Sequence, residues 1–338
     1  SRREAQSYGA GGGVNVTIMA RDAESFRQSR TQVAAAVGCN PAEVVFTSGA
    51  TEAASVLAHP KTGHDILVDQ TAHDALWAQS CMYHWEMKPN GPGHTLAMGL
   101  ANSETGVITR PPEKVDGQWP VGRAAADWLL LDITQAVGRI PFAFSLSGAD
   151  MAILTGHKFG GPKGVGALIV RDNLDTDPLS VGGGQEMGRR SGTENVIGIA
   201  GMGAAIAAAM RDLEAGVWDH VEKLRNILET GVEAASKETI LVGKDVARLP
   251  NTSCLLTPGW KGETQVMAMD LAGFAISAGS ACSSGKVKAS RVLLAMGYNE
   301  ADAASAIRVS LGPENTQEDV TRFVDVWTDK LARHRARG

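Results

Sequence analysis

Short apolar strand patterns alternate with helical patterns along the first half of the chain. The strand patterns lie at residues 44–47, 65–69, 96–99, 128–131, 151–154 and 165–170. Helical patterns occupy residues 23–37 and begin again near Asp74. Strands that are separated by helices are joined by right-handed crossovers, which favour a mainly parallel sheet. The alternation therefore predicts an α/β domain.

A smaller domain is expected beyond this region. Two long helical patterns follow at 195–213 and 217–235, and the first is rich in alanine. The strand patterns after them lie at 239–241, 252–256 and 304–310, and the helical patterns at 264–271, 289–296 and 317–333. Such a mixture is typical of an α+β layer, and 338 residues suffice for two domains. We predict a large domain over 16–235 and a small C-terminal domain over 236–338, with residues 1–15 packed on the small domain.

The composition narrows the class of partner. The formal net charge is -5 without a basic cluster, which argues against nucleic acid as the main partner. No apolar run approaches the roughly 18 residues that span a bilayer, and no secretory apolar segment opens the chain, so we expect no membrane partner. Cys39, Cys81, Cys254 and Cys282 show no CxxC spacing, and no HExxH motif occurs, so neither a disulfide framework nor a metal site is expected. The expected compartment is a reducing cytoplasm.

Two residues at the ends of apolar runs indicate a cofactor. Lys158 lies in ILTGHKFGGPKG (153–164), between an apolar run and a glycine-rich turn. A lysine there can form a Schiff base with an aldehyde cofactor, although Gly-His-Lys also occurs in surface turns. Asp132 ends the apolar run 128–132, at the place where open α/β sheets bind ligands. A carboxylate there can keep the pyridine nitrogen of pyridoxal phosphate protonated, the alternative being a turn or cap acid.

A third segment offers a phosphate site. VVFTSGATE (44–52) passes from a β-branched run through a small-residue turn into a helical pattern. The amides of Gly49, Ala50 and Thr51 at that helix start suit an anion. The lysine spacing of a P-loop is missing, and an ordinary capped helix is the alternative. With Lys158 and Asp132, the segment favours pyridoxal phosphate as the cofactor.

The motifs in this order resemble those of the NifS/IscS-type cysteine desulfurases. That group belongs to the class V aminotransferase family of fold type I pyridoxal phosphate enzymes. The motifs that carry the resemblance are FTSGATE (46–52), TAH (71–73), NSETG (102–106), DITQ (132–135), GHKFGGPKG (156–164), GGGQE (182–186), RSGT (190–193), SACS (280–283) and IRVSLG (307–312). The resemblance implies a large domain with a mainly parallel central sheet and a smaller α+β C-terminal domain.

The resemblance also implies roles at the cofactor ring. Lys158 would carry the cofactor and later move the Cα proton of the substrate. Asp132 would pair with the pyridine nitrogen, and Gln135 would reach the phenolic oxygen. His73 would stack on the ring and handle protons, whereas a histidine met alone is more often a core residue.

Around the cofactor phosphate, the resemblance implies contacts from Thr51, Thr155 and His157, helped by backbone amides. Thr193 would reach the phosphate of a neighbouring subunit, which implies a homodimer. The second asparagine of the family's Asn-Asn-Glu motif commonly contacts the cofactor oxygen or the substrate carboxylate. Ser103 occupies that position here, so the contact would be weaker or pass through water.

Cys282 and Arg308 indicate which reaction is carried out. Cys282 lies in SAGSACSSG (277–285), a run of small residues that predicts a mobile loop, although a small residue in a Gly/Ser turn is the alternative. Its thiolate could attack the sulfur of a cofactor-bound cysteine and carry away a persulfide. Arg308 would bind the α-carboxylate of the substrate with its planar guanidinium.

The leading hypothesis is an L-cysteine desulfurase that yields L-alanine and a persulfide on Cys282. The persulfide would pass to a sulfur-acceptor or iron–sulfur scaffold protein, for iron–sulfur cluster or thio-cofactor assembly. One alternative is a selenocysteine lyase or another pyridoxal phosphate β-lyase, which could share every cofactor residue. The alternative of another class is a non-enzymatic partner in a sulfur-transfer assembly. The family's opening Ala-Thr-Thr and Asn-Pro motifs have no match in residues 1–15, so contacts from that region are not assigned.

Overall fold

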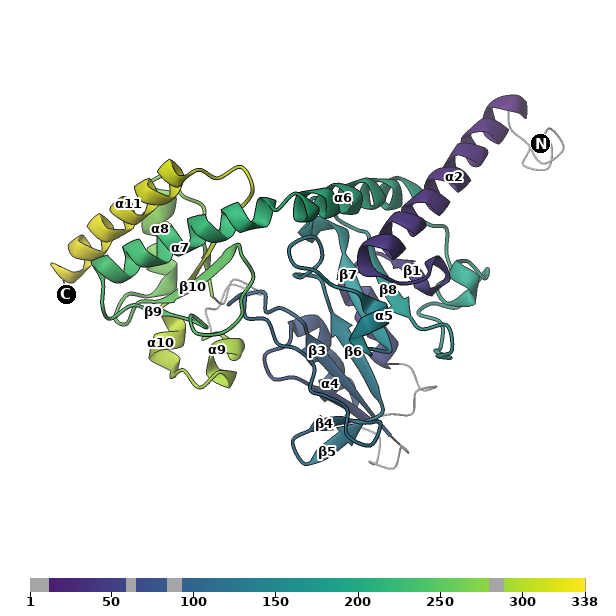
Figure 1. Ribbon diagram of the computed structural model, residues 1–338, viewed down its shortest axis with the longest axis horizontal. Helices are drawn as coiled ribbons and strands as arrows, with labels where there is room; N and C mark the ends of the chain where they lie inside the picture. Colours follow the sequence, from purple (N-terminus) through teal and green to yellow (C-terminus); the bar gives the residue numbers. More distant parts are fainter. Residues whose placement is uncertain (1–11, 59–64, 84–92, 280–288, 338) are drawn as a thin grey trace. The chain divides into compact units, whose positions relative to one another are not determined.

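The computed structural model describes residues 12–58, 65–83, 93–279 and 289–337. They divide into two compact units (Figure 1). Unit 1 takes the described residues of Ser1–Leu67, Ala78–Ala97 and Glu113–Arg211, and unit 2 those of Val68–Trp77, Met98–Pro112 and Asp212–Gly338. The domain limits expected from the sequence, 16–235 and 236–338, stay a prediction, as does the packing of residues 1–15.

Unit 1 is built on a six-stranded sheet in the order β1-β8-β7-β6-β3-β2. Its strands are β1 (Val44–Thr47), β2 (Asp65–Val68), β3 (His94–Gly99), β6 (Trp128–Asp132), β7 (Met151–Thr155) and β8 (Gly166–Val170). β6 and β7 are parallel, whereas β8 is antiparallel to both β7 and β1. β1, β6 and β7 therefore run in one direction, and their carboxyl ends meet at one edge of the sheet. The predicted α/β class with a mostly parallel sheet is confirmed.

The reversed direction of β8 follows from its short connection. Only residues 156–165 lie between β7 and β8. A parallel crossover needs about a dozen residues or more, usually with a helix, so a connection this short favours an antiparallel neighbour. Both strands are buried along their whole length. The apolar runs predicted the two strands but could not give their relative direction.

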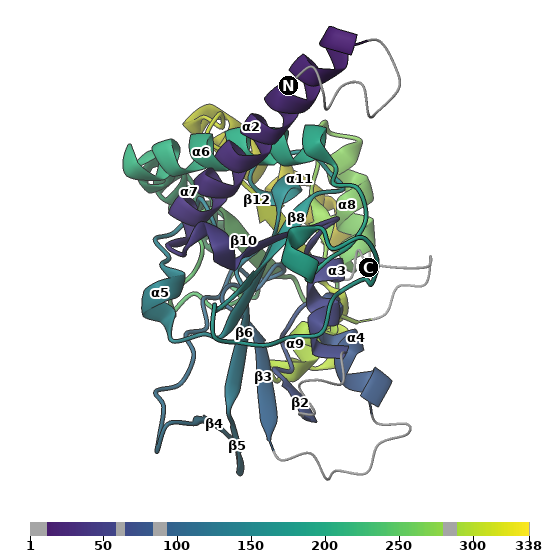
Figure 2. The same ribbon diagram turned by 90° about the vertical axis from the view of Figure 1, so that its right-hand side faces the viewer.

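The helices near this sheet include α2 and α6, which approach each other closely at Gly203 (Figure 2). The helices and 3-10 turns are α2 (Gly12–Val37), η1 (Pro41–Glu43), α3 (Ala50–Ala54), η2 (Ser55–Ala58), α4 (Asp74–Tyr83), α5 (Phe144–Ser147), η4 (Gly156–Lys158), η5 (Glu186–Gly188) and α6 (Val196–Glu214). A Cβ atom on Gly203 of α6 would lie 2.8 Å from the Cα of Ser29 in α2. One on Gly201 would lie 2.6 Å from the ring of Pro162. The small residues of α6 thus let it approach both α2 and the loop after Lys158.

Helix α6 corrects one expectation. We expected no apolar run of membrane-spanning length, but among the described residues Val196–Glu214 is long and apolar enough by length and composition. A single helix of this kind is weak evidence for a membrane span, because core helices pass the same test. Ile199, Met202 and Ile206 of this helix are buried within the protein.

A hairpin that the sequence patterns did not predict precedes β6. Its strands β4 (Trp119–Val121) and β5 (Ala124–Ala126) pair antiparallel, and Gly122 supplies a positive φ of 61° in the two-residue loop. Figures 1 and 2 show the hairpin next to β6, and the chain passes from β5 directly into the amino-terminal end of β6. Both strands are too short to give a clear alternating pattern, and β5 consists of alanine alone.

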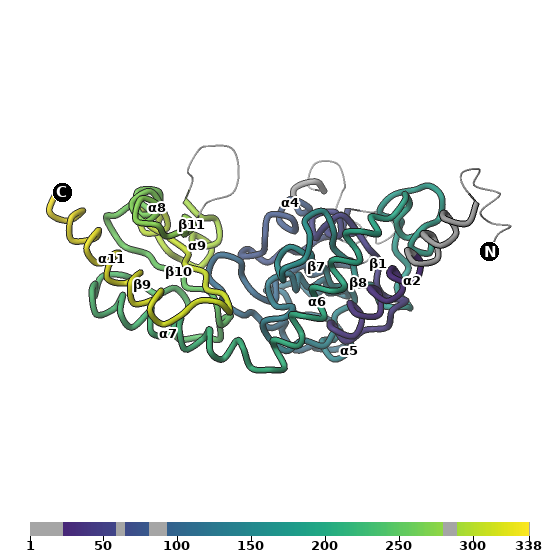
Figure 3. The backbone as a smooth tube through the Cα atoms, turned by 90° about the horizontal axis from the view of Figure 1, so that it is seen from above, coloured from purple at the N-terminus to yellow at the C-terminus, as the bar shows by residue number. Residues whose placement is uncertain are grey.

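Unit 2 contains a four-stranded antiparallel sheet in the order β11-β12-β10-β9. Its elements are α7 (Val217–Ala235), β9 (Ile240–Leu241), β10 (Thr252–Leu256), α8 (Gly262–Asp270), β11 (Ser277–Ala278), α9 (Arg291–Ala295), α10 (Glu300–Ala304), β12 (Ala306–Ser310) and α11 (Gln317–Arg335). Helices α7 and α11 run side by side in Figure 3. The predicted strand at 304–310 begins later, because residues 300–304 form α10, capped by the Asn299 side chain.

The strand β10 separates two hydrophobic clusters. Leu255 packs with residues of α7 and α11, including Trp327, whereas Cys254 and Leu256 pack with Leu293 near α9. This division follows from the two-residue period of a strand, which sends neighbouring side chains to opposite faces. The antiparallel sheet of unit 2 is therefore covered on both faces.

A buried ion pair joins α7 to the segment before β10. Arg248 donates from both Nη atoms to the Glu229 carboxylate, at 2.6 and 2.8 Å, and the Ser253 hydroxyl donates to the same carboxylate at 2.6 Å. The side chains of Arg248 and Glu229 are only 5% and 8% exposed. Burial raises the pKa of Glu229. The hydrogen bonds from Arg248 and Ser253 lower it by a larger amount, so the net pKa lies below its ordinary value.

We expect Glu229→Gln to lower the free energy of unfolding by about 3 kcal/mol, because it leaves a buried guanidinium without its charge partner. The pKa of Glu229 is depressed in the folded state, so its contribution is fully present above the ordinary value of 4.5 and is lost as the pH falls through the lowered pKa. Urea unfolding of both proteins at neutral and acidic pH measures this. Glu233→Gln, which removes an exposed partner of Lys244, is the control. Equal stability of Glu229→Gln and wild type at neutral pH contradicts the prediction.

Candidate functional site

Three loops of unit 1 leave the sheet at the same edge. β1 leads into Gly49 and α3, β6 ends at Asp132, and β7 leads into Gly156 and η4. Because these strands run in one direction, the turn at Gly49, the Asp132 carboxylate and Lys158 all lie at the carboxyl ends of the three strands. The carboxyl edge of such a sheet is where ligands bind in open α/β folds.

Gly166 at the start of β8 lets these loops come together. A Cβ atom there would lie 2.7 Å from the Cα of Gly49 and 2.6 Å from the carbonyl oxygen of Leu154, which no side chain tolerates. A Cβ on Gly49 would in turn lie 3.7 Å from the Thr155 hydroxyl. The turn at Gly49 is therefore a direct neighbour of the strand end that precedes Lys158. The 46–52 motif and the 156–164 motif, far apart in sequence, form one surface.

Two residues of the DITQ segment lie at different depths. Asp132 is buried, and its Oδ1 accepts a hydrogen bond of 2.9 Å from the backbone N–H of Thr134. This bond fixes the rotation of the carboxylate. Gln135 is half-buried, in the turn after the strand.

The Lys158 segment combines a buried hydroxyl with two exposed bases. Thr155 is buried, and its Oγ1 lies 3.1 Å from Nδ1 of His157 and 3.2 Å from the carbonyl oxygen of Val165. His157 and Lys158 are exposed in the one-turn helix η4. Burial lowers the pKa of His157, and the charges of Lys158 and Lys163 lower it further, so the ring is neutral at neutral pH.

Arg139 is a residue of this site that the sequence reasoning missed. Its Nη1 donates to the carbonyl oxygen of Gln135 at 2.9 Å, and its Nη2 donates to that of Lys158. One guanidinium thus joins the backbones of the two loops after β6 and β7. Its position four residues after Gln135 could have indicated the first of these hydrogen bonds, but the second, to Lys158, follows only from the folded structure.

The 46–52 motif holds its own shape through Glu52. The Glu52 carboxylate accepts hydrogen bonds from the Ser48 backbone N–H and from Nε of Arg190, the latter at 2.9 Å. Burial raises the pKa of Glu52, but these hydrogen bonds lower it more, and the net pKa is below its ordinary value. Thr51 is exposed one residue earlier, and Ala50 is half-buried at the start of α3.

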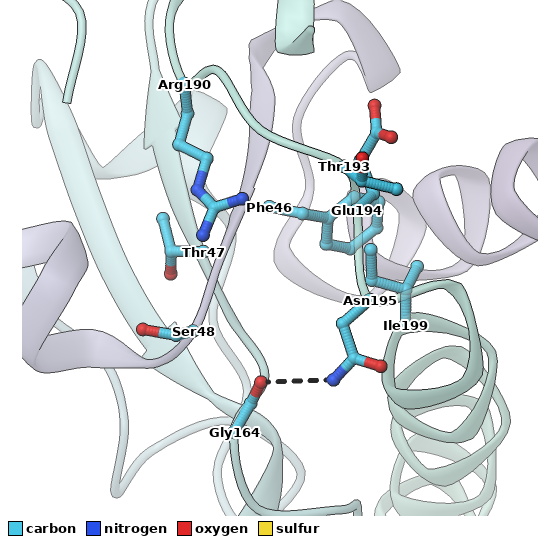
Figure 4. Close-up of a pocket in the computed structure, with 9 residues that line it drawn as sticks. All are labelled: Phe46, Thr47, Ser48, Gly164, Arg190, Thr193, Glu194, Asn195 and Ile199. Carbon is cyan, nitrogen blue, oxygen red and sulfur yellow. Dashed lines mark hydrogen bonds between the residues drawn. The ribbon is translucent and has the colours of Figure 1, made fainter. Parts of the chain in front are cut away.

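A small pocket of about 70 Å³ lies beside this motif. Figure 4 shows its lining residues, which are Phe46, Thr47, Ser48, Gly164, Arg190, Thr193, Glu194, Asn195 and Ile199. The side-chain amide of Asn195 donates to the carbonyl oxygen of Gly164 across the pocket at 3.4 Å. Thr193 is exposed at the rim, on the segment that leads into α6.

Unit 2 brings together a second set of predicted residues. Arg308 in β12 donates from Nη1 to the backbone carbonyl of Ser103 at 2.9 Å and from Nη2 to the Ser277 hydroxyl at 3.2 Å. Its buried Nε has no hydrogen-bond partner among the described residues. A half-buried guanidinium that is held in this way is suited to a carboxylate ligand. Ser103 is half-buried and takes part in this contact through its backbone carbonyl.

His73 caps the first turn of α4. Its Nδ1 accepts a hydrogen bond of 3.1 Å from the backbone N–H of Ala75. A backbone N–H can only donate, so Nδ1 carries no proton and the neutral ring is protonated at Nε2. Asn102, another residue that we had not assigned, ties this turn to the Ser103 loop by donating to the carbonyl oxygen of Thr71 at 2.9 Å.

The cysteines differ in what the structure shows of them. Cys282 lies outside the described residues. Cys254 is buried in β10, and Cys39 is half-buried after α2. Burial raises the pKa of each thiol to about 12, with Glu43 and Asp172 adding to the effect at Cys39 and Glu104 at Cys254. Both therefore remain unreactive thiols at neutral pH.

Comparison with known proteins places the chain in a family. The aminotransferase class-V model matches residues 94–323. A cysteine desulfurase of Nostoc sp. is 34% identical over 93% of this chain and 84% of its own length, and one of Frankia sp. is 36% identical over 91% and 81%. A solved NifS-like protein is 27% identical, with a TM-score of 0.80 over 96% of this chain and 91% of its own.

A NifS-like protein of Rickettsia africae has a TM-score of 0.76 at 26% identity, over 91% of this chain and 88% of its own. The resemblance predicted from the sequence motifs is thus confirmed by sequence and by fold. The chain belongs to the class-V aminotransferase family and is a relative of the cysteine desulfurases.

Proposed function

We propose that this protein is a pyridoxal phosphate-dependent L-cysteine desulfurase. The observation that carries the proposal is the shared edge in unit 1, where Lys158, Asp132 and the turn at Gly49 follow three strands of one direction. The cysteine desulfurases among the relatives support the choice of reaction. They also favour an enzyme over a non-enzymatic partner in sulfur transfer.

The residues at this edge fit pyridoxal phosphate. The amides of Gly49, Ala50 and Thr51, with the Thr155 hydroxyl and His157, would hold the phosphate. Such a phosphate site adjoins Lys158 because Gly49 is a neighbour of Thr155. The fixed Asp132 carboxylate would hold the ring nitrogen, and Gln135 the phenolic oxygen. When bound, the cofactor supplies an electron sink for bonds broken at the substrate.

The chain's own residues would handle the amino acid around that group. Arg308 would bind the α-carboxylate with its guanidinium, while Ser103 and Ser277 hold that group in place. Lys158 would hold the cofactor aldehyde and move the Cα proton. His73, whose Nε2 carries the proton in the neutral ring, would stack on the cofactor and donate or accept at that atom.

Cys282 would take the sulfur. Its thiolate attacks the substrate sulfur, so that an S–S bond forms while the Cβ–S bond breaks. Cβ takes up a proton, and L-cysteine with the Cys282 thiol gives L-alanine and a Cys282 persulfide. The high thiol pKa of Cys39 and Cys254 supports Cys282 as the nucleophile, since neither of these two is available as a thiolate.

We further propose a homodimer in which Thr193 reaches the phosphate of the neighbouring subunit. The exposed position of Thr193 at a pocket rim beside Arg190 supports this role. The persulfide would pass to a sulfur-acceptor or iron–sulfur scaffold protein in a reducing, cytoplasmic setting, without nucleic acid or a membrane as partner.

The proposed reaction predicts equal amounts of alanine and sulfide from L-cysteine when a thiol reductant is present. Cys282→Ser is expected to retain the cofactor absorbance and to release almost no sulfide, because the persulfide cannot form. Lys158→Ala is expected to lose the visible absorbance band of the protein-bound cofactor. Cys39→Ser, which removes an unreactive thiol, is the matched control and is expected to behave as wild type.

Full sulfide release by Cys282→Ser contradicts the persulfide mechanism. Turnover of selenocysteine but not cysteine by the wild type would instead indicate a selenocysteine lyase. A purified protein that binds no pyridoxal phosphate when the cofactor is added contradicts the proposal as a whole.

Arg139→Met is expected to lower kcat about tenfold or more, because it releases the Lys158 backbone and a misplacement of the order of 1 Å is that costly. Arg139→Lys is expected to retain part of the activity. Its ammonium can reach one of the two carbonyls, but it lacks the planar pair of donors that lets a guanidinium bind both. The sulfide assay and the cofactor spectrum measure both. Arg211→Met, an exposed arginine of α6, is the control. Wild-type kcat in Arg139→Met contradicts the role.

A further inference from the structure

Arg291 contacts the turn that carries His73, over 200 residues earlier in the chain. It is the first residue of α9, and its Nη1 donates to the carbonyl oxygen of Gln70. Its Nη2 donates to the carbonyl oxygen of Ala72 at 2.6 Å and to the Asp74 carboxylate at 3.1 Å. The acceptors on Ala72 and Asp74 lie on the two sides of His73.

Shape, more than charge, gives this contact its strength. The Asp74 side chain is 69% exposed, so its attraction to Arg291 is screened by water. The two backbone carbonyls and the ring of Trp77, whose centroid lies 4.6 Å from the Arg291 Cζ, fix the guanidinium plane. Only an arginine has donors in a flat fork that can also stack on an aromatic ring.

The shape of the turn at residues 72–75 determines the orientation and the tautomer of the His73 ring. The imidazole accepts from the Ala75 N–H through Nδ1, and this bond requires the backbone of residues 72–75 to keep its shape. The carbonyl oxygen of His73 also accepts from the N–H groups of Leu76 and Trp77, at 2.9 and 3.1 Å. A shift of the turn would therefore change both the orientation of the ring and the nitrogen that carries the proton.

The start of α9 is itself fixed to the neighbouring loop. Ser290 is buried, and its hydroxyl donates to the Glu104 carboxylate next to Ser103. The same hydroxyl accepts from the Leu293 N–H at 3.2 Å and so caps α9. Arg291 thus projects from an anchored helix start, which makes it a rigid support rather than a loose surface side chain.

We propose that Arg291 is a positioning residue for His73, holding the turn 70–74 so that the ring keeps its Nδ1 bond and presents a protonated Nε2. The inference rests on the proposed catalytic role of His73. It adds a residue that lies outside the sequence motifs that carry the resemblance to the family. Arg291 acts through His73 and does not itself contact substrate or cofactor.

A double-mutant cycle in the cofactor-loaded protein tests the inference. Arg291→Met is expected to lower kcat for sulfide release about tenfold or more, with KM and melting temperature close to wild type. In a His73→Gln background the same change is expected to have almost no further effect, because the two residues act as one network. A merely structural arginine would cause its full loss in both backgrounds, and that result overturns the inference.

Two further variants guard against a folding artefact. Arg291→Lys keeps the charge and can reach one acceptor, so an intermediate kcat is expected. Arg333→Met removes an equally charged, exposed residue of the same unit and is expected to match wild type. An Arg291→Lys protein with wild-type kcat would show that the fork is not needed, which overturns the proposed geometry.

A readout independent of turnover separates this inference from the proposed function. In 15N-histidine spectra, the neutral His73 ring is expected to show a bare Nδ1 and a protonated Nε2, with the signal identified by its loss in His73→Gln. Arg291→Met is expected to move these signals towards a mixture of tautomers, whereas Arg333→Met leaves them in place. Unchanged His73 signals in Arg291→Met overturn the inference. If His73→Gln is as active as wild type, only the catalytic role of His73 fails, and the spectra still decide whether Arg291 positions the ring.

Discussion

The common direction of β1, β6 and β7 is the constraint on which the site of unit 1 depends. The loop after a strand begins at the carboxyl end of that strand. Three strands that run in one direction therefore have their following loops at the same edge of the sheet. β8 lies between β1 and β7 and runs the other way, which brings its first residue, Gly166, to that edge. Because Gly166 has no side chain, the turn at Gly49 can touch the strand end before Lys158. A larger residue at this one position would push the two loops apart.

Arginines that donate to backbone carbonyls hold the functional loops in both units. Arg139 joins the loops of Gln135 and Lys158, Arg308 holds Ser103, and Arg291 holds the turn before α4. A guanidinium suits this task because it offers several donors in one plane and remains charged. Loops lack the regular hydrogen bonds of helices and strands, so their carbonyls need partners from elsewhere in the chain. Each of these arginines supplies at least one such partner from another segment of the chain.

The parts of the site that could be predicted from the sequence are those with local signals. Lys158, Asp132 and Gly49 each follow an apolar run, and the end of a buried run marks the end of a strand whatever the strand's neighbours are. The hairpin before β6 could not be predicted, since its strands have no periodic pattern of sufficient length. The direction of β8 was missed because an apolar run carries no direction, and the short connection of residues 156–165 had not been used as a signal. The contacts of Arg139 and Arg291 could not be recognised from a sequence motif, because they involve backbone carbonyls and every residue has one. The extent of α6 was predicted well by the helical pattern at 195–213, but we did not count this alanine-rich run as apolar enough to span a bilayer.

The sequence by itself determined the family, the α/β class, and the residue types that we propose for the cofactor and amino-acid contacts, because these depend on side-chain chemistry and on short-range hydrophobic pattern. Tertiary structure alone decided which strand edge those residues share, which nitrogen of His73 is protonated, and which arginines hold the loops. Contacts between segments 19 to 221 residues apart decide the shared edge and the arginine contacts, whereas the bond from Ala75, two residues away, sets the tautomer of His73 within the folded turn. Such contacts depend on the path of the backbone in space, which a local pattern of side chains does not encode.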